Sequence, residues 1–316
     1  MNDVIPIFYA VDDKYSPFLS VTMKSLIENC DPSRKYHIHV IYETMSDENR
    51  ERIMKLETDY AKIEFSEMTD KLEVIEDAIG NRLRAEIFTL TIYFRLFIPE
   101  MFPQYKKAIY IDSDTVVPGD IAQLYDIELG DNFFAACPDR STTHNETLAR
   151  YFEEYVGISR DRYINSGVLL LDLEKLRERR LADKFLELYN TYEFPLAAPD
   201  QDYLNFLCKD RILILEPEWN AMSESEEVVE EPRIIHYNLF KKPWRYTDVR
   251  YGDYFWKYAK ETEYYDEILE MLRSYTDEEK REDDEHMKMM VDQAGVLTES
   301  ETTPKKIFES GAEERL

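Results

Sequence analysis

The order of apolar and polar positions predicts alternating strands and helices at the start of the chain. Residues 5–11, 36–42 and 62–65 are short apolar runs, which are typical of buried strands. Residues 17–29 lie between the first two runs and carry apolar side chains at near-helical spacing after an opening proline. Strands that alternate with helices in this way favour a parallel, doubly wound α/β sheet.

A second helix is predicted between the second and third apolar runs. Ser46 is a candidate N-cap, and the acidic residues that follow it suit the positive end of a helix. Ile53, Leu56 and Tyr60 would form the apolar face of this helix.

Further along, the same patterns continue. A long helical stretch is expected to end in residues 90–98, before Pro99, and a charged amphipathic helix to cover residues 173–192. Another helix is predicted to begin at Pro199. The remaining apolar runs predict strands at residues 109–118 and 133–137, directly after Gly167, and at residues 212–215 and 234–236.

The last part of the chain has a different composition. From about Tyr251 it is helical in pattern and richly charged, and residues 276–316 contain 13 acidic and 6 basic side chains. We therefore predict one α/β domain over residues 1–250 and a helical, acidic extension over residues 251–316, with a frayed and partly disordered end.

Charge and cysteine content narrow the possible partners. A net charge of −27 argues against nucleic-acid binding, which needs clustered basic residues. Cys30, Cys137 and Cys208 are widely spaced and odd in number, which suggests a reducing compartment. No run approaches the ~20 apolar residues of a membrane span, so we expect a cytoplasmic protein. Peripheral membrane contact and a homo-oligomer are both left open.

The run at residues 109–118 contains the first candidate chemistry. Asp112 and Asp114 lie one residue apart, so in an extended chain both carboxylates point to the same face. The carboxyl end of a central strand is where α/β sheets bind ligands, and two carboxylates suit Mg²⁺ or Mn²⁺. The sequence therefore predicts a site for a metal and a diphosphate.

Two other interpretations fit the same residues. The segment could be an acidic turn, or Asp112 could be the nucleophile of an aspartyl-phosphate phosphatase. The phosphatase interpretation fails because about 110 residues with three predicted strands precede the motif, and because Gly130-Asp131 and Gly252-Asp253 lack the second aspartate of its later metal motif.

Six motifs occur in one order along the chain. They are Asp12-Asp13, Arg95, Asp112-Ser113-Asp114, Asn165-Ser166-Gly167, Asp200-Gln201-Asp202 and His236-Tyr237 followed by Lys242-Pro243-Trp244. From residue 5 to residue 244 the chain resembles retaining glycosyltransferase family 8, which includes bacterial lipopolysaccharide glucosyl- and galactosyltransferases and the glycogenins.

The resemblance implies a fold and an activity. The expected fold is GT-A: a Rossmann-like nucleotide-binding domain with a mainly parallel mixed sheet between helices. The expected reaction transfers glucose or galactose from a UDP-sugar to a hydroxyl of a saccharide or glycolipid acceptor, with Mn²⁺ or Mg²⁺ and with retention of anomeric configuration. The resemblance also implies a part in the biosynthesis of lipopolysaccharide or another cell-surface polysaccharide.

The resemblance also implies roles for single residues. Asp112, Asp114 and His236 look like the metal ligands, and the imidazole favours Mn²⁺ over Mg²⁺. Lys242 would contact the diphosphate, and Asp12 would accept a hydrogen bond from uracil. The other expected nucleotide-sugar contacts are Ala10, Tyr15, Arg95, Ser113, Asn165 and Ser166. The expected catalytic residues are Gln201 beneath the anomeric carbon, Asp139 and Asp200 on sugar hydroxyls, and Arg95 beside the donor sugar and the aspartate pair.

Two positions depart from the family pattern. Leu239 replaces a glycine common in the loop after His236, where the backbone would approach the diphosphate closely, and Lys14 replaces a common asparagine in the uracil loop. In addition, a basic, aromatic tail that tethers some members to membranes is replaced here by an acidic one.

The means of retention stays open at this level. A double displacement needs a carboxylate nucleophile, but Gln201 carries an amide. We therefore prefer a front-face route, in which the departing phosphate deprotonates the incoming hydroxyl. A non-catalytic nucleotide-sugar-binding or interaction protein with the same fold is the alternative function.

Overall fold

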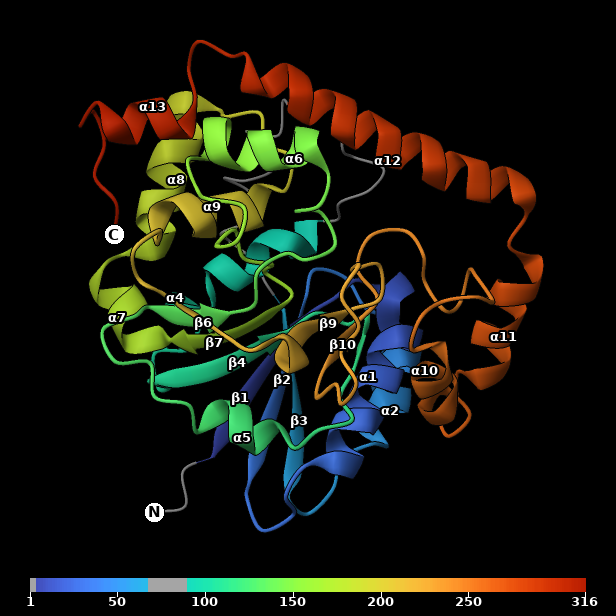
Figure 1. Cartoon of the computed structure of the whole chain (residues 1–316). Helices are drawn as coiled ribbons and strands as arrows, with labels where there is room; N and C mark the ends of the chain where they lie inside the picture. Colours follow the sequence, from blue (N-terminus) through green and yellow to red (C-terminus); the bar gives the residue numbers. More distant parts are fainter. Residues whose placement is uncertain (1–3, 68–89) are drawn as a thin grey trace.

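The main sheet is mixed, and six of its seven strands are parallel. The computed structural model describes residues 4–67 and 90–316, and within them the strand order is β3-β2-β1-β4-β7-β6-β8 (Figure 1). Only β7 runs against its neighbours β4 and β6. The strands are β1 (Ile5–Ala10), β2 (Tyr36–Tyr42), β3 (Ala61–Glu67), β4 (Lys107–Ile111), β6 (Phe134–Ala136), β7 (Val168–Asp172) and β8 (Ile212–Ile214). The predicted mainly parallel α/β sheet is confirmed.

The sheet separates two apolar cores, and alternate residues of one strand enter different cores. In β1, Ile7 and Tyr9 face one core, whereas Phe8 and Ala10 face the other. Because side chains of a strand alternate between the two faces, a buried central strand must be apolar on both. This explains why β1 reads as an unbroken apolar run.

The first helices agree with the sequence pattern except at one end. They are η1 (Asp13–Tyr15), α1 (Ser16–Asn29) and α2 (Asp47–Met54). Ser46 caps α2 as predicted, since its side chain accepts a hydrogen bond from the amide of Asn49. Leu56 and Tyr60 lie beyond α2, so their assignment to its apolar face is wrong. The hydroxyl of Thr58 accepts hydrogen bonds from the amides of Tyr60 and Ala61, and this turn leads the chain into β3.

The helical stretch predicted before Pro99 also differs from the structure. Its part before residue 90 lies outside the described residues. The rest forms a 3₁₀ helix, η2 (Leu90–Leu96), followed by α4 (Ile98–Met101). Pro99 lies inside the first turn of α4, where the missing amide hydrogen of proline costs nothing.

The predicted strand over residues 109–118 is two strands in two sheets. Strand β4 ends directly before Asp112, and residues 112–114 form a break between strands. The next strand, β5 (Thr115–Val116), belongs to a small second sheet. The other strands of that sheet are β9 (Ala221–Met222) and β10 (Ile235–His236). The hydroxyl of Thr22 on α1 lies 2.8 Å from the carbonyl oxygens of both Ser113 and Thr115, so α1 supports the break.

The predicted helix over residues 173–192 is divided in two. α7 (Leu173–Glu178) and α8 (Leu181–Tyr192) are separated by Arg180, whose φ of 57° is left-handed. The bend allows both Leu176 on α7 and Phe185 on α8 to enter the same core.

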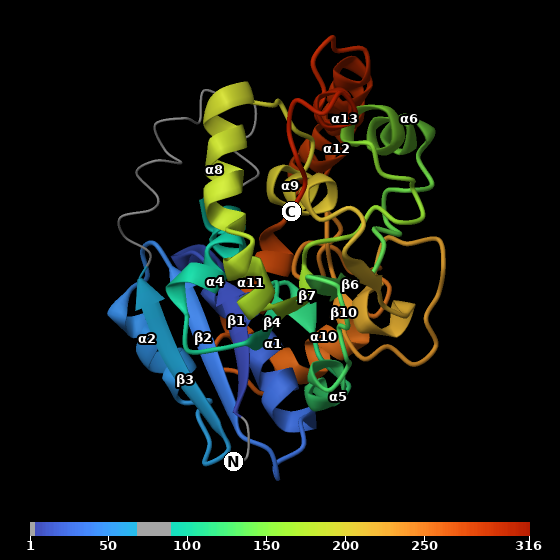
Figure 2. The same ribbon diagram turned by 90° about the vertical axis from the view of Figure 1, so that its left-hand side faces the viewer.

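Helices α6 (Glu146–Arg150), α8 and α9 (Pro199–Leu207) lie on one side of the strands (Figure 2). The other helices between β5 and β9 are α5 (Ile121–Tyr125), the π-helix η3 (Tyr151–Val156) and the 3₁₀ helix η4 (Pro217–Asn220).

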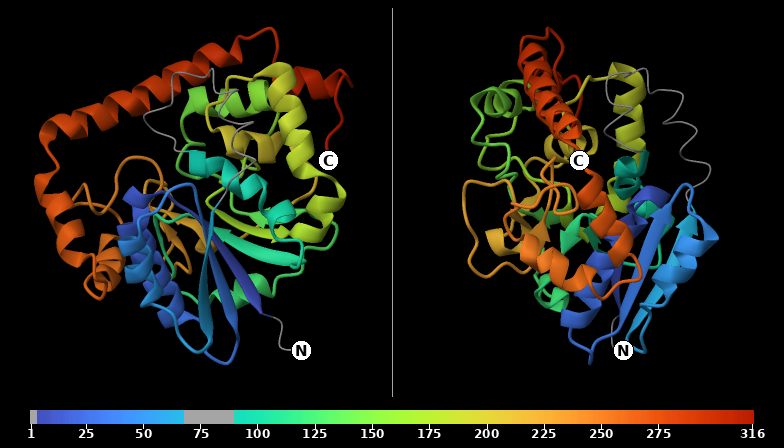
Figure 3. Two further views of the ribbon diagram at one scale, coloured as in Figure 1. Left: turned by 180° about the vertical axis from the view of Figure 1, so that it is seen from behind. Right: turned by 90° about the vertical axis from the view of Figure 1, so that its right-hand side faces the viewer.

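The acidic extension packs on the rest of the protein. It contains α10 (Gly252–Ala259), α11 (Tyr265–Ser274), α12 (Asp277–Thr298) and α13 (Pro304–Glu309). Helix α12 runs along the outside of the molecule to α6 (Figure 3).

The end of the chain differs from the frayed, partly disordered segment that we predicted. Leu297 and Phe308 enter a core, and the amide of Leu316 donates a hydrogen bond to the carbonyl of Leu207. These few apolar residues give an otherwise charged segment a surface to bury. The division of the chain at residue 250 stays a prediction.

In the part of the chain that the structure describes, no helix has the combined length and apolar character needed to span a bilayer. The cytoplasmic location stays a prediction.

Asp202 is an acidic side chain buried within the fold. Its carboxylate accepts hydrogen bonds from the hydroxyls of Tyr163 (2.6 Å) and Tyr151 (2.8 Å) and from the amide of Ala198 (3.0 Å). It therefore joins α9 to η3 and to the loop before β7, and it points away from Asp200. This agrees with the rule that helical neighbours face different directions.

We expect Asp202→Asn to lower the free energy of unfolding by about 2 kcal/mol, because asparagine offers one acceptor oxygen where the two carboxyl oxygens accept from three buried donors. Thermal and urea denaturation would measure the loss. The control is Asp210→Asn, since Asp210 is exposed on the same part of the chain. If the two variants were equally stable, the hydrogen bonds of Asp202 would not stabilise the fold as we expect.

Candidate active site

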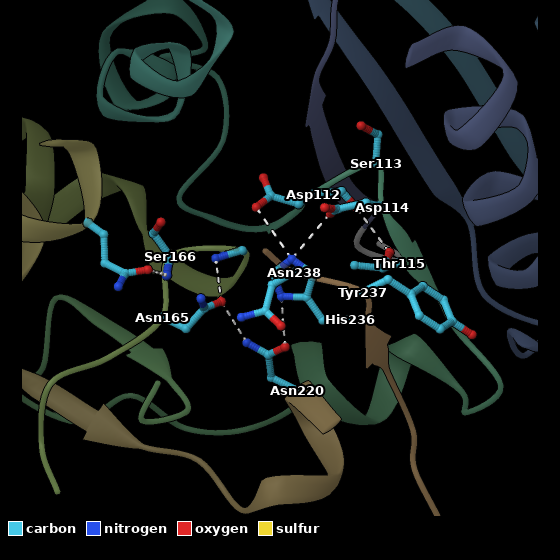
Figure 4. A network of polar contacts seen from close by, with 12 residues as sticks. Asp112, Ser113, Asp114, Thr115, Asn165, Ser166, Asn220, His236, Tyr237 and Asn238 are labelled. Carbon is cyan, nitrogen blue, oxygen red and sulfur yellow. Dashed lines mark hydrogen bonds and ion pairs between the residues drawn. The ribbon is translucent and has the colours of Figure 1, made fainter. Parts of the chain in front are cut away.

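Asp112, Asp114 and His236 meet where the two sheets join. The aspartates occupy the break between β4 and β5, and His236 lies on β10, opposite Thr115. His236 Nε2 is 3.2 Å from Asp114 Oδ1 and 3.9 Å from Asp112 Oδ2 (Figure 4). One ligand atom from each of the three side chains lies within 4.8 Å of the others. Two carboxylates and one imidazole form a donor set that suits a divalent cation.

Arg95 holds two carboxylates of the site. It is 6% exposed, and its guanidinium donates to Asp112 Oδ1 (2.8 Å) and pairs with Asp200 Oδ2 at 3.1 Å. It also donates to the carbonyl of Ser166 and stacks over the ring of Tyr110. Burial raises the pKa of Asp200 above its ordinary value, and Arg95 opposes that rise. A buried guanidinium needs an anionic partner. Arg95 has two, Asp112 and Asp200.

Lys242 occupies the other side of Asp114. Its Nζ lies 2.5 Å from Asp114 Oδ2 and also donates to the carbonyl of Tyr237. Burial by itself would raise the pKa of Asp114, but Lys242 and His236 outweigh burial and hold that pKa below its usual range. Asp114 is therefore a carboxylate at neutral pH, as a metal ligand must be.

A second group of polar side chains centres on Asp139. Its Oδ2 accepts hydrogen bonds from Gln201 Nε2 (3.1 Å) and Asn165 Nδ2 (3.2 Å). Gln201 Oε1 in turn accepts from the amide of Ser166. The hydroxyl of Ser166 donates to Asp200 at 2.9 Å, which links this group to Arg95. The structure thus brings these predicted sugar-contacting residues together with the candidate metal ligands.

The residues expected at the nucleotide gather at the end of β1. Ala10 ends β1, and the pairing of Phe8 with Tyr110 places this end beside the end of β4, directly before Asp112. Asp12 Oδ1 accepts from the amide of Tyr15 and so caps η1. Burial raises the pKa of Tyr15, and the positive charge of nearby Lys242 opposes that rise. The roles of these residues and of the buried Ser113 stay predictions.

Sequence reasoning missed Asn220. Its Nδ2 donates to Asn165 Oδ1 at 2.9 Å, and its Oδ1 lies 3.1 Å from His236 Nδ1 (Figure 4). A carbonyl oxygen at Nδ1 favours a proton there, so Nε2 is the nitrogen that would bind a cation held by the aspartates. No local motif marks Asn220. Only the pairing of β9 with β10 brings the segment after Asn220 beside His236.

Two backbone positions next to the site are constrained. A Cβ on Gly167 would lie 2.3 Å from His236 Cε1 and 2.7 Å from Asp112 Oδ2, so glycine is needed there. Leu239 has a φ of 60°, the left-handed conformation that glycine adopts most easily. The expected glycine geometry is therefore kept in this loop although the residue is leucine.

Comparison with known proteins agrees with this arrangement. Residues 6–248 match the model of "Glycosyl transferase family 8". The chain belongs to that family.

Relatives of this family 8 protein include a bacterial stress protein and a lipopolysaccharide enzyme. The chain is 26% identical over 284 residues to General stress protein A of Bacillus subtilis, covering 83% of this chain and 96% of the relative. It is 27% identical over 271 residues to the Lipopolysaccharide 1,2-glucosyltransferase of Escherichia coli K12, covering 79% and 77%. The galactosyltransferase LgtC, solved in complex with donor and acceptor sugar analogs, superposes with a TM-score of 0.70 at 26% identity, covering 82% of this chain and 96% of LgtC. The predicted family and the GT-A-like fold are confirmed.

In this family 8 chain, we expect Gly167→Ala to weaken Mn²⁺ binding at least tenfold, because the added methyl group displaces His236 or Asp112. Mn²⁺ titration followed by electron paramagnetic resonance would measure the affinity. Gly252→Ala is the matched control, since a Cβ there meets only Val249 at 3.8 Å. If both variants bound Mn²⁺ as the unchanged protein does, the three side chains would not form one ion site.

Proposed function

We propose that this family 8 glycosyltransferase transfers glucose or galactose from a UDP-sugar to a hydroxyl of a saccharide or glycolipid acceptor, with retention and with a divalent cation. The observation that carries this proposal is the meeting of Asp112, Asp114 and His236 within 4.8 Å, with Lys242 against Asp114. The likeness to the E. coli glucosyltransferase and to the galactosyltransferase LgtC supports glucose or galactose as the transferred sugar.

The residues present fit a divalent cation. Asp112, Asp114 and His236 would hold it, and Arg95 and Asn220 already orient two of these three side chains. When bound, the cation acts as a Lewis acid on the diphosphate and stabilises the charge of departing UDP. An imidazole in the donor set favours Mn²⁺ over Mg²⁺, because nitrogen is the softer ligand.

Lys242 supplies a second positive charge for the leaving group. It is a buried ammonium whose side-chain partner is Asp114. If Asp114 turns to a cation, Lys242 can donate to the terminal phosphate oxygen of UDP as negative charge develops there. A fixed donor in a site of low dielectric is worth more than the same donor in water.

The contacts of Gln201 support the front-face route over a covalent intermediate. Both ends of its amide are engaged, by Asp139 and by the amide of Ser166, which suits a positioning group rather than a nucleophile. Asp200 is held by Arg95 and Ser166. In the front-face route the bond from C1 to the phosphate oxygen breaks, and the acceptor oxygen bonds to C1 from the same side. The acceptor proton passes to the departing phosphate.

The first test is release of UDP from UDP-glucose or UDP-galactose. We expect Mn²⁺-dependent release that falls by at least about a hundredfold in Asp114→Asn, and a product whose anomeric proton, observed by NMR, keeps the configuration of the donor. The exposed variant Asp131→Asn is the control. Tight UDP binding without turnover on any acceptor would support the non-catalytic alternative, and release independent of metal would contradict the proposed site.

The second test compares the charge of Lys242 with that of the adjacent Lys241. We expect Lys242→Met to lower kcat by about a hundredfold, with a smaller change in KM, because the charge acts mainly on the departing UDP. Lys241→Met changes charge equally at an exposed position and should leave kcat within about twofold. Thermal denaturation would confirm that both variants fold. Equal kcat values would remove Lys242 from the leaving-group site.

A further inference from the structure

A second cluster of metal-ligating side chains lies on β2 and β3, away from the candidate active site. His37 and His39 are two residues apart on β2 and therefore point to the same face. Glu64 is paired in register with His39 on β3, the strand at the edge of the sheet (Figure 2). This cluster shares no residue with Asp112, Asp114 and His236.

The spacing of the three side chains is close to that around one ion. His37 Nε2 lies 2.9 Å and His39 Nδ1 lies 3.9 Å from the same oxygen, Glu64 Oε2. One ligand atom from each residue lies within 4.8 Å of the others. Ligands bound to zinc at about 2 Å lie no more than roughly 4 Å apart, so small side-chain movements would suffice.

The hydroxyl of Tyr105 contacts the opposite nitrogens of both imidazoles. It lies 2.7 Å from His37 Nδ1 and 3.0 Å from His39 Nε2. The hydroxyl can accept a hydrogen bond from His39 Nε2 and donate its own proton to His37 Nδ1. This arrangement leaves the lone pair of His39 Nδ1 directed into the cluster and a proton on His37 Nε2 that Glu64 accepts and that a bound cation would displace. Metal-binding histidines are commonly oriented by such an outer hydrogen bond.

His39 has an unsatisfied nitrogen that points into the cluster. The residue is 1% exposed, and its Nδ1 has no hydrogen-bond partner among the described residues. A buried imidazole nitrogen without a partner costs free energy, and a bound cation would remove that cost. Glu64 is half-exposed and gives solvent access to the cluster.

We propose that His37, His39 and Glu64 form a second cation site, with Tyr105 as the group that orients the two imidazoles. Two imidazoles and one carboxylate select Zn²⁺ and similar ions such as Co²⁺ over Mg²⁺ and Ca²⁺, and leave one position for water. The cation would bind β2 to the edge strand β3. The site is independent of the transferase reaction.

The test is titration of the purified full chain with Zn²⁺ and, separately, Co²⁺, without nucleotide. The protein with Asp114→Asn should keep a cation site and show the visible absorption bands of tetrahedral Co²⁺. Adding Glu64→Gln or His37→Gln should weaken that binding by at least about tenfold and remove the bands. Adding His144→Gln, at an exposed histidine, is the matched control and should change neither.

Thermal denaturation gives a second readout. The midpoint should rise with Zn²⁺ concentration in Asp114→Asn, because an ion that binds only the folded state stabilises it, and the rise should disappear in the double variants. A Co²⁺ spectrum or a Zn²⁺ response that survives both Glu64→Gln and His37→Gln would overturn the proposal. Absence of binding to folded Asp114→Asn would overturn it too, whatever the transferase activity proves to be.

Discussion

The arrangement of the active site depends on holding three aspartates together against their mutual repulsion. Arg95 joins Asp112 to Asp200, and Lys242 pairs with Asp114. The formal charges are three negative against two positive, so the cluster keeps an excess of negative charge in a largely buried place. Such an excess is relieved either by protonation, which burial favours at Asp200, or by a further positive partner. The protein therefore has a physical reason to bind a divalent cation, independent of its resemblance to relatives.

The same cluster explains the break in the chain after β4. Apolar residues fill both faces of β4, but Asp112 has to turn toward Arg95 and Asp114 toward Lys242 and His236. One continuous strand could not pair with β1 and β7 in the main sheet and also with β10 in the small sheet. The hydroxyl of Thr22 contacts the carbonyl of Ser113, between the two strands, and that of Thr115, at the start of β5. The short β5 then pairs with β10, which places His236.

The acidic extension is linked to the loop that carries Lys242. Asp283 on α12 is buried, and its carboxylate accepts from Arg245 (3.3 Å), from the hydroxyl of Tyr246 (3.0 Å) and from that of Tyr275 (2.8 Å). Arg245 and Tyr246 follow Lys242 closely in the chain. The acidic extension, whose composition suggests a solvent-exposed segment, thus contributes one buried carboxylate that holds the loop carrying Lys242.

The sequence by itself predicted the strands of the main sheet, the order of the motifs and a candidate metal site, because runs of apolar residues and closely spaced carboxylates are local properties. It placed β2 at its observed bounds, and it singled out Asp112, Asp114 and His236 before any geometry was known. Only the tertiary structure decided which partners these residues have. The division of residues 109–118 between two sheets, the bend at Arg180 and the contact of Asn220 with His236 all depend on segments far apart in the chain. No local pattern encodes such contacts, because their free energy comes from packing and charge pairing that exist only once the chain has folded.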